Sequence, residues 1–256
     1  MRILHLILYS ESDIEKYDKM KEILGEYYKS FEPNIKTFFY KYDNNIQQEY
    51  HINDNLLLIK GDETYIPGIL EKTLKAFEFF QNMEFDYLVR SNTSTIINFE
   101  LLVKKLLDKP ISFYGGGKVL NLQWMGCGIT DYTFFGTLYA SGTSIILTKN
   151  AVDILINNKN LIRKYIIDDL AIGIFFKEYI SNIIPQEIDD KLFLTTPCFF
   201  NYDNNILDKE GLTECVVKNN PIFYRNRIVD DRMIDKRMVD ILQMREIVNI
   251  LKKNNF

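Results

Sequence analysis

The apolar positions of this chain change period from segment to segment, which predicts strands and helices in alternation. Apolar runs with little internal alternation predict strands that are buried on both faces, at residues 2–10, 36–43, 55–63 and 85–92. Elsewhere in this half, apolar side chains recur every three or four positions and predict amphipathic helices, at residues 13–30, 67–82 and 99–108. The pattern is typical of an α/β fold.

The second half of the chain has a different pattern. Residues 111–147 are rich in Gly, Tyr, Phe and Ser and contain short β-like runs, which predict a mixed sheet with loops. Further helices are predicted at 149–158, around 168–180 and at about 231–253, a strand or loop at 220–227, and a polar loop at 44–55. No linker separates the parts, so residues 1–110 and 111–256 are interpreted as two halves of a single domain.

Composition narrows the class of protein. With 46% hydrophobic and 26% charged residues, the chain is neither disordered nor a bundle of membrane spans. A net charge of -4 disfavours nucleic acid as a partner. The three cysteines are too few and too scattered for a disulfide framework. The first ten residues predict a strand and not a signal peptide, so we expect a cytoplasmic protein without a membrane span.

Several common catalytic motifs are absent from the sequence. It contains no GxGxxG and no GxxxxGK[ST], which disfavours dehydrogenases and P-loop NTPases. It also contains no HExxH, GxSxG or Cys/His cluster, which disfavours catalysis by histidine. Of the two histidines, His5 falls inside the first predicted strand and His51 in the polar loop. We expect His5 to be a neutral histidine of the core.

Polar residues gather where the predicted parallel strands end. Open α/β sheets bind ligands at this edge. The strand ends carry Tyr9, Ser10, Asp43, Asp62, Arg90, Ser91 and Asn92.

Three stretches, taken in order, resemble a known family. They are DETYIPGILEKTLKAFEFFQNMEFDYLVRSNTSTIINFELLVKKL at 62–106, YASGTSIILTKNAVDIL at 139–155 and DDLAIG at 168–173. The order is similar to that of the β-1,3-galactosyltransferase and fringe group, which has a helix with a K-T pair, a strand ending in DxD, an SG motif and an E-D-V-x-x-G motif. The resemblance covers about residues 55–180 and implies a GT-A fold, built like a Rossmann sheet with an acceptor-side extension.

The metal-binding motif of that family is degenerate here. Asn92, Thr93 and Ser94 stand where the family has D-D-D, and neutral oxygens hold Mg²⁺ or Mn²⁺ far less well than carboxylates do. Asn92 and Ser94 are therefore weak metal candidates, and a metal requirement is left open. We expect Arg90, Arg225 and Arg227 to neutralise the donor diphosphate instead, the alternative being ordinary surface or ion-paired arginines.

The last motif implies the catalytic base. Asp169 aligns with the aspartate of E-D-V and Asp168 with the glutamate. In an inverting sugar transfer a carboxylate accepts the proton of the attacking hydroxyl, and Asp169 is the candidate. Adjacent residues at a helix start cannot point identically, so only one should face the acceptor. The alternative is a pair of acids that cap the helix.

Other residues are assigned to substrates through the resemblance. Ser141 and Gly142 match the small pair beside the donor sugar, and Tyr9, Ser10 and Asp62 are expected on the donor side. The triple glycine around Gly116 is expected to form a flexible acceptor loop, with Trp124 offering a sugar-stacking surface. Each has a structural alternative, namely a bulge at Gly142, a simple mobile turn at the glycines and a core position for the tryptophan.

The sequence thus predicts an inverting glycosyltransferase. Residues 1–110 would bind a nucleotide sugar, with a UDP-sugar favoured, and 111–256 would bind a glycan or glycoconjugate acceptor. The alternatives are a catalytically silent module that binds sugar nucleotides or glycans, and a metal-assisted phosphoester hydrolase that uses Asp168 and Asp169.

Overall fold

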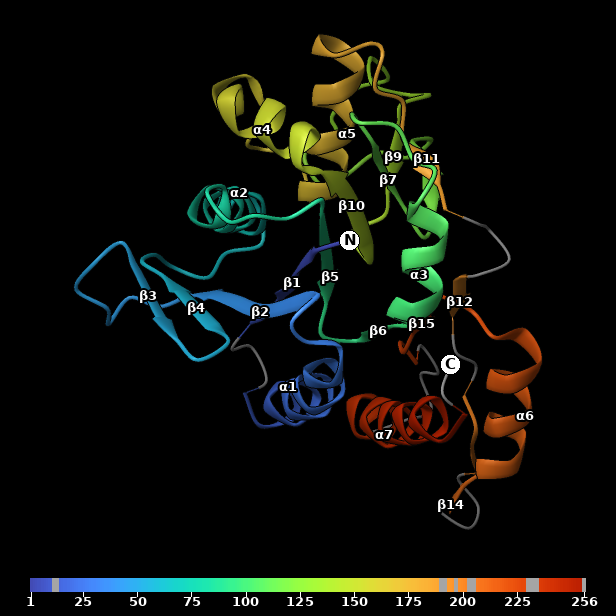
Figure 1. Ribbon diagram of the computed structural model, residues 1–256. Helices are drawn as coiled ribbons and strands as arrows, with labels where there is room; N and C mark the ends of the chain where they lie inside the picture. The colour runs from blue at the N-terminus through green and yellow to red at the C-terminus, as the bar shows by residue number, and fades with distance from the viewer. Residues whose placement is uncertain (11–13, 189–192, 196–197, 202–205, 229–234, 255–256) are drawn as a thin grey trace.

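The computed structural model describes residues 1–10, 14–188, 193–195, 198–201, 206–228 and 235–254. The described strands include an eight-stranded mixed sheet with the order β11-β7-β10-β5-β1-β2-β4-β3 (Figure 1). Its strands are β1 (Ile3–Leu8), β2 (Ile35–Tyr42), β3 (Tyr50–Asn53), β4 (Leu56–Ile59), β5 (Tyr87–Asn92), β7 (Tyr114–Gly116), β10 (Ser144–Thr148) and β11 (Gln186–Glu187). The α/β class and the mixed central sheet are confirmed.

The strand directions bring one set of loops together. β1 runs parallel to β2 and β5, and β2 runs parallel to β4, so the carboxyl ends of these four strands share one edge. β10 is antiparallel to β5, with Ser144 opposite Ser91, and therefore begins at the same edge. We call this edge the carboxyl edge.

Helices cover both faces of the sheet. The helices are α1 (Ile14–Tyr28), α2 (Gly68–Phe80), α3 (Phe99–Leu106), α4 (Lys149–Asn157), α5 (Asp168–Tyr179), α6 (Lys209–Asn219) and α7 (Lys236–Asn254). Figure 1 shows α2, α4 and α5 on one face, with α1 and α7 on the other. Side-chain caps start several of them: Asn98, Thr148 and Asp208 each accept a backbone N–H of the first helical turn.

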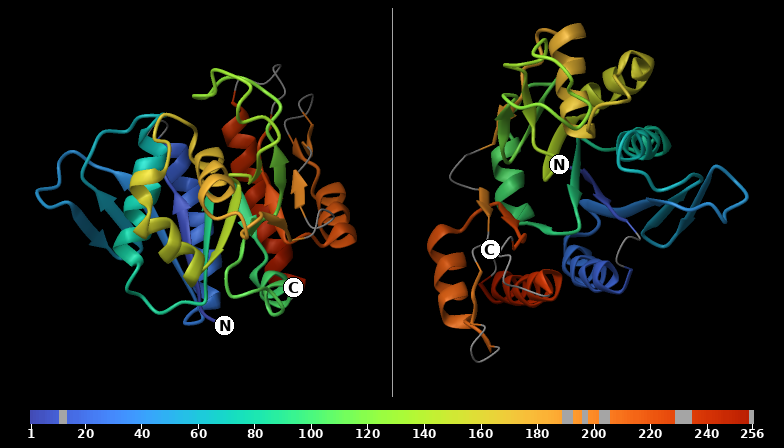
Figure 2. Two further views of the ribbon diagram at one scale, coloured as in Figure 1. Left: turned by 90° about the horizontal axis from the view of Figure 1, so that it is seen from above. Right: turned by 180° about the vertical axis from the view of Figure 1, so that it is seen from behind.

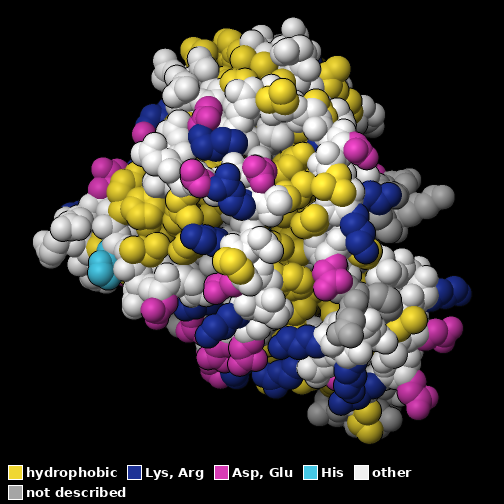
Figure 3. All heavy atoms as spheres, in the orientation of Figure 1, with side chains coloured by type: hydrophobic (Ala, Val, Ile, Leu, Met, Phe, Trp, Pro, Cys, Tyr) yellow, Lys and Arg dark blue, Asp and Glu magenta, His cyan; other side chains and the backbone are white. Residues whose placement is uncertain are grey.

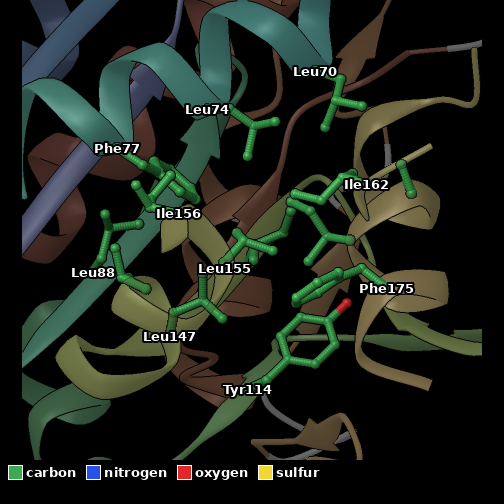
Figure 4. Close-up of a cluster of buried hydrophobic side chains, with 14 of the residues drawn as sticks. Leu70, Leu74, Phe77, Leu88, Tyr114, Leu147, Leu155, Ile156, Ile162 and Phe175 are labelled. Carbon is green, nitrogen blue, oxygen red and sulfur yellow. The ribbon is translucent and has the colours of Figure 1, made fainter. Parts of the chain in front are cut away.

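Each face has its own buried core. In the core shown in Figure 4, Leu74 and Phe77 of α2 and Phe175 of α5 pack, together with α4, against Leu88 and Leu147 of the sheet. Such side chains contribute roughly 1.5–3 kcal/mol each when buried. This packing fixes α5 against the sheet, and with it the acids at its first turn.

His5 belongs to the opposite core. Its ring is fully buried between Tyr28 and Phe99, and its nitrogens lie 2.8 Å from Ser91 Oγ and 3.3 Å from Thr37 Oγ1. Burial lowers its pKa to about 3. The prediction of a neutral core histidine is confirmed.

Smaller sheets complete the described structure. β6 (Thr95–Ile97) pairs antiparallel with β15 (Phe223–Arg225), which also pairs with β12 (Phe193–Thr195). The other two are hairpin-like pairs, β8 (Val119–Asn121) with β9 (Leu138–Ala140) and β13 (Phe200–Asn201) with β14 (Ile206–Leu207). The pairing of β6 with β15 sets Arg225 opposite Thr95, directly after β5.

The structure confirms most predicted elements and corrects others. Strand β3 lies inside the stretch 44–55 that was predicted to be a loop, so His51 is in a strand. Helix α6 and strand β6 were not predicted. The last helix begins at Lys236; residues 231–234 of its predicted range lie outside the described residues. Within the described residues, every helix is too short or too polar to cross a membrane.

Candidate functional site

Three segments meet at the carboxyl edge beside β5. They are the end of β5 itself, the turn 141–143 that precedes β10, and the first turn of α5. The long connection 122–137 lies close to the start of α5, where Ile167 N donates to the Cys127 carbonyl over 3.1 Å. In the left view of Figure 2, this yellow-green connection extends beyond the top of the sheet.

Arg90 ties these segments together. Its Nη2 lies 2.5 Å from Asp168 Oδ2, its Nη1 donates to the Gly142 carbonyl at 2.5 Å, and its Nε donates to the Tyr40 hydroxyl at 3.3 Å. The Arg90 side chain is 2% exposed and that of Asp168 is 6% exposed. Burial disfavours the charged guanidinium, but Asp168, Tyr40 and Asp169 together outweigh this effect and raise the pKa of Arg90. Arg90, expected at the diphosphate, is thus held in a buried ion pair.

Asp169 has a different environment from its neighbour. Its Oδ2 accepts the backbone N–H of Gly142 at 2.8 Å, and its Oδ1 accepts that of Leu170 at 2.8 Å. The residue is partly exposed, whereas Asp168 is buried. Burial of the carboxyl group and the negative charge of Asp168 raise the pKa of Asp169 to about 6. A carboxylate with this pKa is suited to accept a proton near neutral pH.

The turn at Gly142 leaves no room for a side chain. A Cβ built there would lie 2.9 Å from Arg90 Nη1 and 3.2 Å from Asp169 Oδ2. Ser141 is partly exposed, and its Oγ accepts the hydroxyl of Thr143 at 3.1 Å. The predicted SG pair and the predicted acid are therefore direct neighbours in the structure.

Arg225 occupies the degenerate motif. Its Nη1 donates to Asn92 Oδ1 and to Ser94 Oγ, and lies 3.5 Å from Thr95 Oγ1. Burial, together with Arg227 and Arg237, lowers the pKa of Arg225 to about 10, so the guanidinium is still charged at neutral pH. Arg227 is exposed and makes no hydrogen bond or ion pair with the described residues.

These residues do not fit a divalent cation. Asn92 and Ser94 supply no carboxylate, and their side-chain oxygens already accept hydrogen bonds from Arg225. Within the described part of the chain, no three His, Cys, Asp or Glu side chains are grouped as metal ligands. The metal that the family resemblance implies therefore has no suitable ligand set at this motif.

The residues expected at the nucleoside lie along the ends of β1 and β4. Tyr9 is 3% exposed, and its hydroxyl donates to Asp18, so its ring packs under α1. Ser10 is partly exposed, and the exposed Asp62 accepts a hydrogen bond from Asn44.

A buried lysine at these strand ends was not predicted from the sequence. Lys72, 1% exposed, donates to both oxygens of Glu63 at 2.8 and 2.5 Å and to the Tyr9 carbonyl at 3.2 Å. The Lys72-Thr73 pair of the family resemblance was the available signal, because Thr73 Oγ1 lies 2.9 Å from the Tyr40 hydroxyl that holds Arg90.

The two residues expected at the acceptor have different surroundings. Gly116 is buried in β7, where a Cβ would lie 2.2 Å from the Ser144 carbonyl oxygen, and Gly115 precedes it in the same strand. The expectation of a flexible loop at these two glycines is wrong, because the sheet needs glycine for close packing. Trp124 is 37% exposed in the connection 122–137, so it is not a core residue.

Further exposed aromatic side chains accompany Trp124. Tyr65 is 58% and Tyr165 is 78% exposed. The Tyr65 hydroxyl lies 3.8 Å from Cys127 Sγ, in the same connection as Trp124. Partial burial, Cys127 and, to a smaller extent, Asp168 and Asp169 raise the pKa of Tyr65. Gly128 lies against the Tyr165 carbonyl. An aromatic surface thus borders the acidic start of α5.

The described surface has several hollows away from these residues. The hollow between Glu49, α2 and residues 159–164 measures about 350 Å³ and is lined mostly by charged side chains of both signs. None of the predicted site residues lines it or the three others at Lys209, Arg2 and Phe31. Figure 3 shows positive and negative side chains interspersed over the visible face, consistent with the small net charge.

Comparisons with known proteins found similarity only among solved structures. No protein-family model matches the chain, and no curated protein matches it in sequence. A glycosyltransferase involved in the glycosylation of the major capsid of PBCV-1 is 12% identical with a TM-score of 0.45, over 95% of this chain and 99% of that one. GlyE of Streptococcus pneumoniae TIGR4 is 11% identical with a TM-score of 0.43, over 99% of this chain and 63% of that one. The galactosyltransferase LgtC, solved with donor and acceptor sugar analogues, is 10% identical with a TM-score of 0.42, over 95% of each chain.

Proposed function

We propose that this protein transfers a sugar, with inversion, from a nucleoside-diphosphate sugar to a hydroxyl group of a glycan or glycosylated acceptor. The observation that carries the proposal is the position of Asp169. Its carboxylate is fixed to the turn of the SG pair by a 2.8 Å hydrogen bond, and its pKa is raised to about 6. A base beside a close backbone turn at the carboxyl edge is what direct sugar transfer requires.

The reaction needs one proton transfer and one displacement. The acceptor oxygen attacks the anomeric carbon from the face opposite the leaving nucleoside diphosphate, and the bond from this carbon to the phosphate oxygen breaks. The Asp169 carboxylate accepts the hydroxyl proton as the new glycosidic bond forms. The nucleoside diphosphate leaves with the electron pair of the broken bond, so atoms and charge balance.

Asp168 and Arg90 position the base in this proposal. Asp168 is bound by Arg90 and buried, so it does not compete for the acceptor proton. Arg90 also donates a hydrogen bond to the Gly142 carbonyl, and the Gly142 N–H donates one to Asp169. The base is thereby connected to β5 and to the turn before β10 by side chains that are themselves buried, which supports a fixed geometry.

The donor would lie across the carboxyl edge from β1 to β10. The sugar would lie against Ser141 and Gly142, and the diphosphate near Asn92, Ser94, Arg225 and Arg227. Tyr9, Ser10 and Asp62 are on the side of β1 and β4, where the nucleoside would bind. A UDP-sugar remains the favoured donor through the family resemblance.

The acceptor would bind on the aromatic side of Asp169. Tyr65, Trp124 and Tyr165 offer exposed ring faces next to the start of α5, and apolar faces of pyranose rings pack well on such surfaces. Three such side chains favour a glycan over a small alcohol as the acceptor, because a small alcohol would contact only a minor part of this surface.

Direct assay of the full chain tests the proposal. Nucleotide sugars of different base and sugar are screened by thermal shift, and any that stabilise the protein are incubated with glycan acceptors while nucleoside diphosphate and product are measured. We expect stabilisation by one base and sugar, and a product of inverted anomeric configuration by NMR. Binding without turnover would favour the silent module instead. Retention of configuration, or phosphate release from simple phosphoesters, would contradict the proposed reaction.

A further inference from the structure

The degenerate motif at the end of β5 is in contact with a cationic side chain of the same protein, Arg225. We infer that Arg225 takes the position of a divalent metal ion and binds the donor diphosphate directly, so that the anion site works without metal. This inference rests on the proposed function for the identity of the ligand. The geometry of Asn92, Ser94, Thr95 and Arg225 carries it.

The hydrogen-bonding capacity of the motif is already filled. Asn92 Oδ1 accepts from Arg225 Nη1, from Ser94 Oγ at 3.2 Å and from Thr95 Oγ1 at 2.9 Å. A carbonyl oxygen of this kind has two lone pairs, so no acceptor capacity is left for a metal ion. Ser94 Oγ donates to Asn92 and accepts from Arg225, so it is occupied as well.

The fold fixes the guanidinium of Arg225 at this motif. The antiparallel pairing of β15 with β6 sets Arg225 opposite Thr95, and Asn226 N donates to the Ser94 carbonyl at 2.8 Å. The backbone of β15 is therefore fixed against the turn that follows β5. A side chain anchored in this way is preorganised, and little entropy is lost when it binds a ligand.

Arg225 has further N–H donors beyond those that it uses at the motif. All the hydrogen bonds that Arg225 makes with described residues use Nη1. Its Nη2 and Nε therefore retain N–H groups without a partner in the described structure. The N–H groups of Nε and Nη2 lie along one edge of the planar guanidinium, and such an edge matches two oxygens of a phosphate group.

The positive charge of Arg225 lies among neutral partners. Every described partner of Arg225 is neutral, although the residue is largely buried. Asp240 is the acid that interacts electrostatically with Arg225. Its carboxylate already accepts hydrogen bonds from Arg237 Nη1 at 2.9 Å and from Ile228 N at 3.1 Å. The exposed Arg227 adds further positive charge. Buried charge without a counter-ion is costly, and an anionic ligand supplies one.

The experiment measures binding of inorganic pyrophosphate to the full chain by calorimetry. With EDTA in excess, we expect wild-type affinity to be unchanged, and added Mn²⁺ not to improve it. Arg225→Gln should weaken binding about 10- to 100-fold, since hydrogen bonds to a charged group are lost. Arg225→Lys should bind more weakly than wild type because the ammonium lacks the planar fork. Arg245→Gln removes the same charge from an exposed position on α7 and should bind as wild type does.

A second variant keeps the guanidinium and changes its partner. Asn92→Asp places a carboxylate against Arg225, which neutralises the cation and should weaken pyrophosphate binding in EDTA. Thermal unfolding of every variant shows whether it is folded. The inference is overturned if EDTA abolishes binding and Mn²⁺ restores it, or if folded Arg225→Gln and Asn92→Asp both bind as wild type does.

The result separates this inference from the proposed function. Metal-dependent pyrophosphate binding together with sugar transfer would overturn the inference and leave the transferase assignment intact. Metal-free pyrophosphate binding without binding of any nucleotide sugar would support the anion site and contradict the transferase assignment.

Discussion

At the start of α5, two adjacent acids differ in their partners and therefore in their chemistry. Asp168 forms a buried ion pair with the guanidinium of Arg90. Asp169 faces a backbone N–H and is partly exposed, so its ionised form is less favoured. One acid holds the site together and the other is available to exchange a proton, although only the direction of each side chain distinguishes them.

Replacement of Asp169 by asparagine tests the catalytic role. The amide of Asp169→Asn can still accept the Gly142 N–H but cannot accept the acceptor proton. We expect turnover to fall about 100-fold or more, with donor affinity within severalfold of wild type. Both are measured on the same purified protein, and Asp108→Asn, which changes an exposed acid in the same way, serves as control. Retained turnover would remove Asp169 from the mechanism.

The raised pKa of Asp169 predicts the pH dependence of the reaction. The base must be deprotonated, so kcat/KM should be constant above pH 6 and should fall tenfold per pH unit below it. The profile is measured with donor and acceptor below saturation. An acid limb centred near 3.8, the ordinary value for aspartate, would show that the carboxylate is not desolvated in the free enzyme.

The sequence was most informative about these acids and least informative about Arg90. The family order placed Asp168, Asp169, Ser141 and Gly142 in one site, and the structure brings them together. Arg90 was assigned to the diphosphate because it stands at a strand end beside the degenerate motif, where a guanidinium could neutralise the charge that a metal would otherwise bind. Its actual partners, Tyr40 and Asp168, come from segments about fifty and eighty residues away, a tertiary arrangement that local pattern cannot reveal.

At the scale of elements, the turn before β10 connects the base to the sheet. The N–H of Gly142 donates to Asp169, and the carbonyl oxygen of Gly142 accepts from Arg90. Neither bond uses a side chain, so the turn works only if the backbone approaches both groups closely. The space around Gly142 is correspondingly filled.

Gly142→Ala tests this close approach. The added methyl group would lie 2.9 Å from Arg90 Nη1, so the arginine and the acid must move apart. We expect destabilisation of about 1–3 kcal/mol by denaturant unfolding, and a loss of turnover of about 10- to 100-fold because the base is displaced.

The control for Gly142→Ala is Gly25→Ala in helix α1, where the nearest atom is 3.7 Å away. It should leave turnover unchanged and stabilise the protein slightly, since alanine favours helix. Equal turnover in wild type and Gly142→Ala would show that the turn does not position the base.

Elements with strong periodicity were predicted well, and short elements were not. The apolar runs of β1 and β5 and the spacing of α2 gave the correct types, because packing on two faces imposes those patterns. β3 was missed because an edge strand with three exposed positions has a polar sequence. α6 was missed because only Leu212 and Val216 of its residues are buried, which is too few for a visible stripe.

At the scale of the whole molecule, the sheet order brings distant segments to one edge. β5 lies between β1 and β10. The carboxyl ends of strands from the first half of the chain therefore meet the turn that precedes β10, which belongs to the second half. β15, from near the end of the described chain, adds Arg225 to the same region through β6. These residues could be predicted as site candidates from the sequence, but the residues that contact them could not, because topology depends on which strands pair.

The same topology connects the proposed base with the stability of the whole protein. The pKa of Asp169 is about 6 in the folded protein and 3.8 in the absence of its surroundings. Between these values the folded state binds more protons than the unfolded state, so stability falls as pH rises from 3.8 to 6 and the loss is complete above 6. Asp169→Asn removes this loss because the amide is uncharged at every pH.

We therefore expect Asp169→Asn to be more stable than wild type above pH 6, and the difference to shrink as pH falls toward 3.8. The measurement is the free energy of unfolding by denaturant across this range, taken as variant minus wild type so that the other titrating groups cancel. Asp108→Asn should show no such trend, because its side chain is exposed. A variant that gains stability and loses turnover would identify Asp169 as a group held ionised at a cost to the fold, as expected of a functional acid. A difference that is constant with pH would mean that burial does not raise the pKa, and the acid limb of the activity profile should then shift toward 3.8 as well.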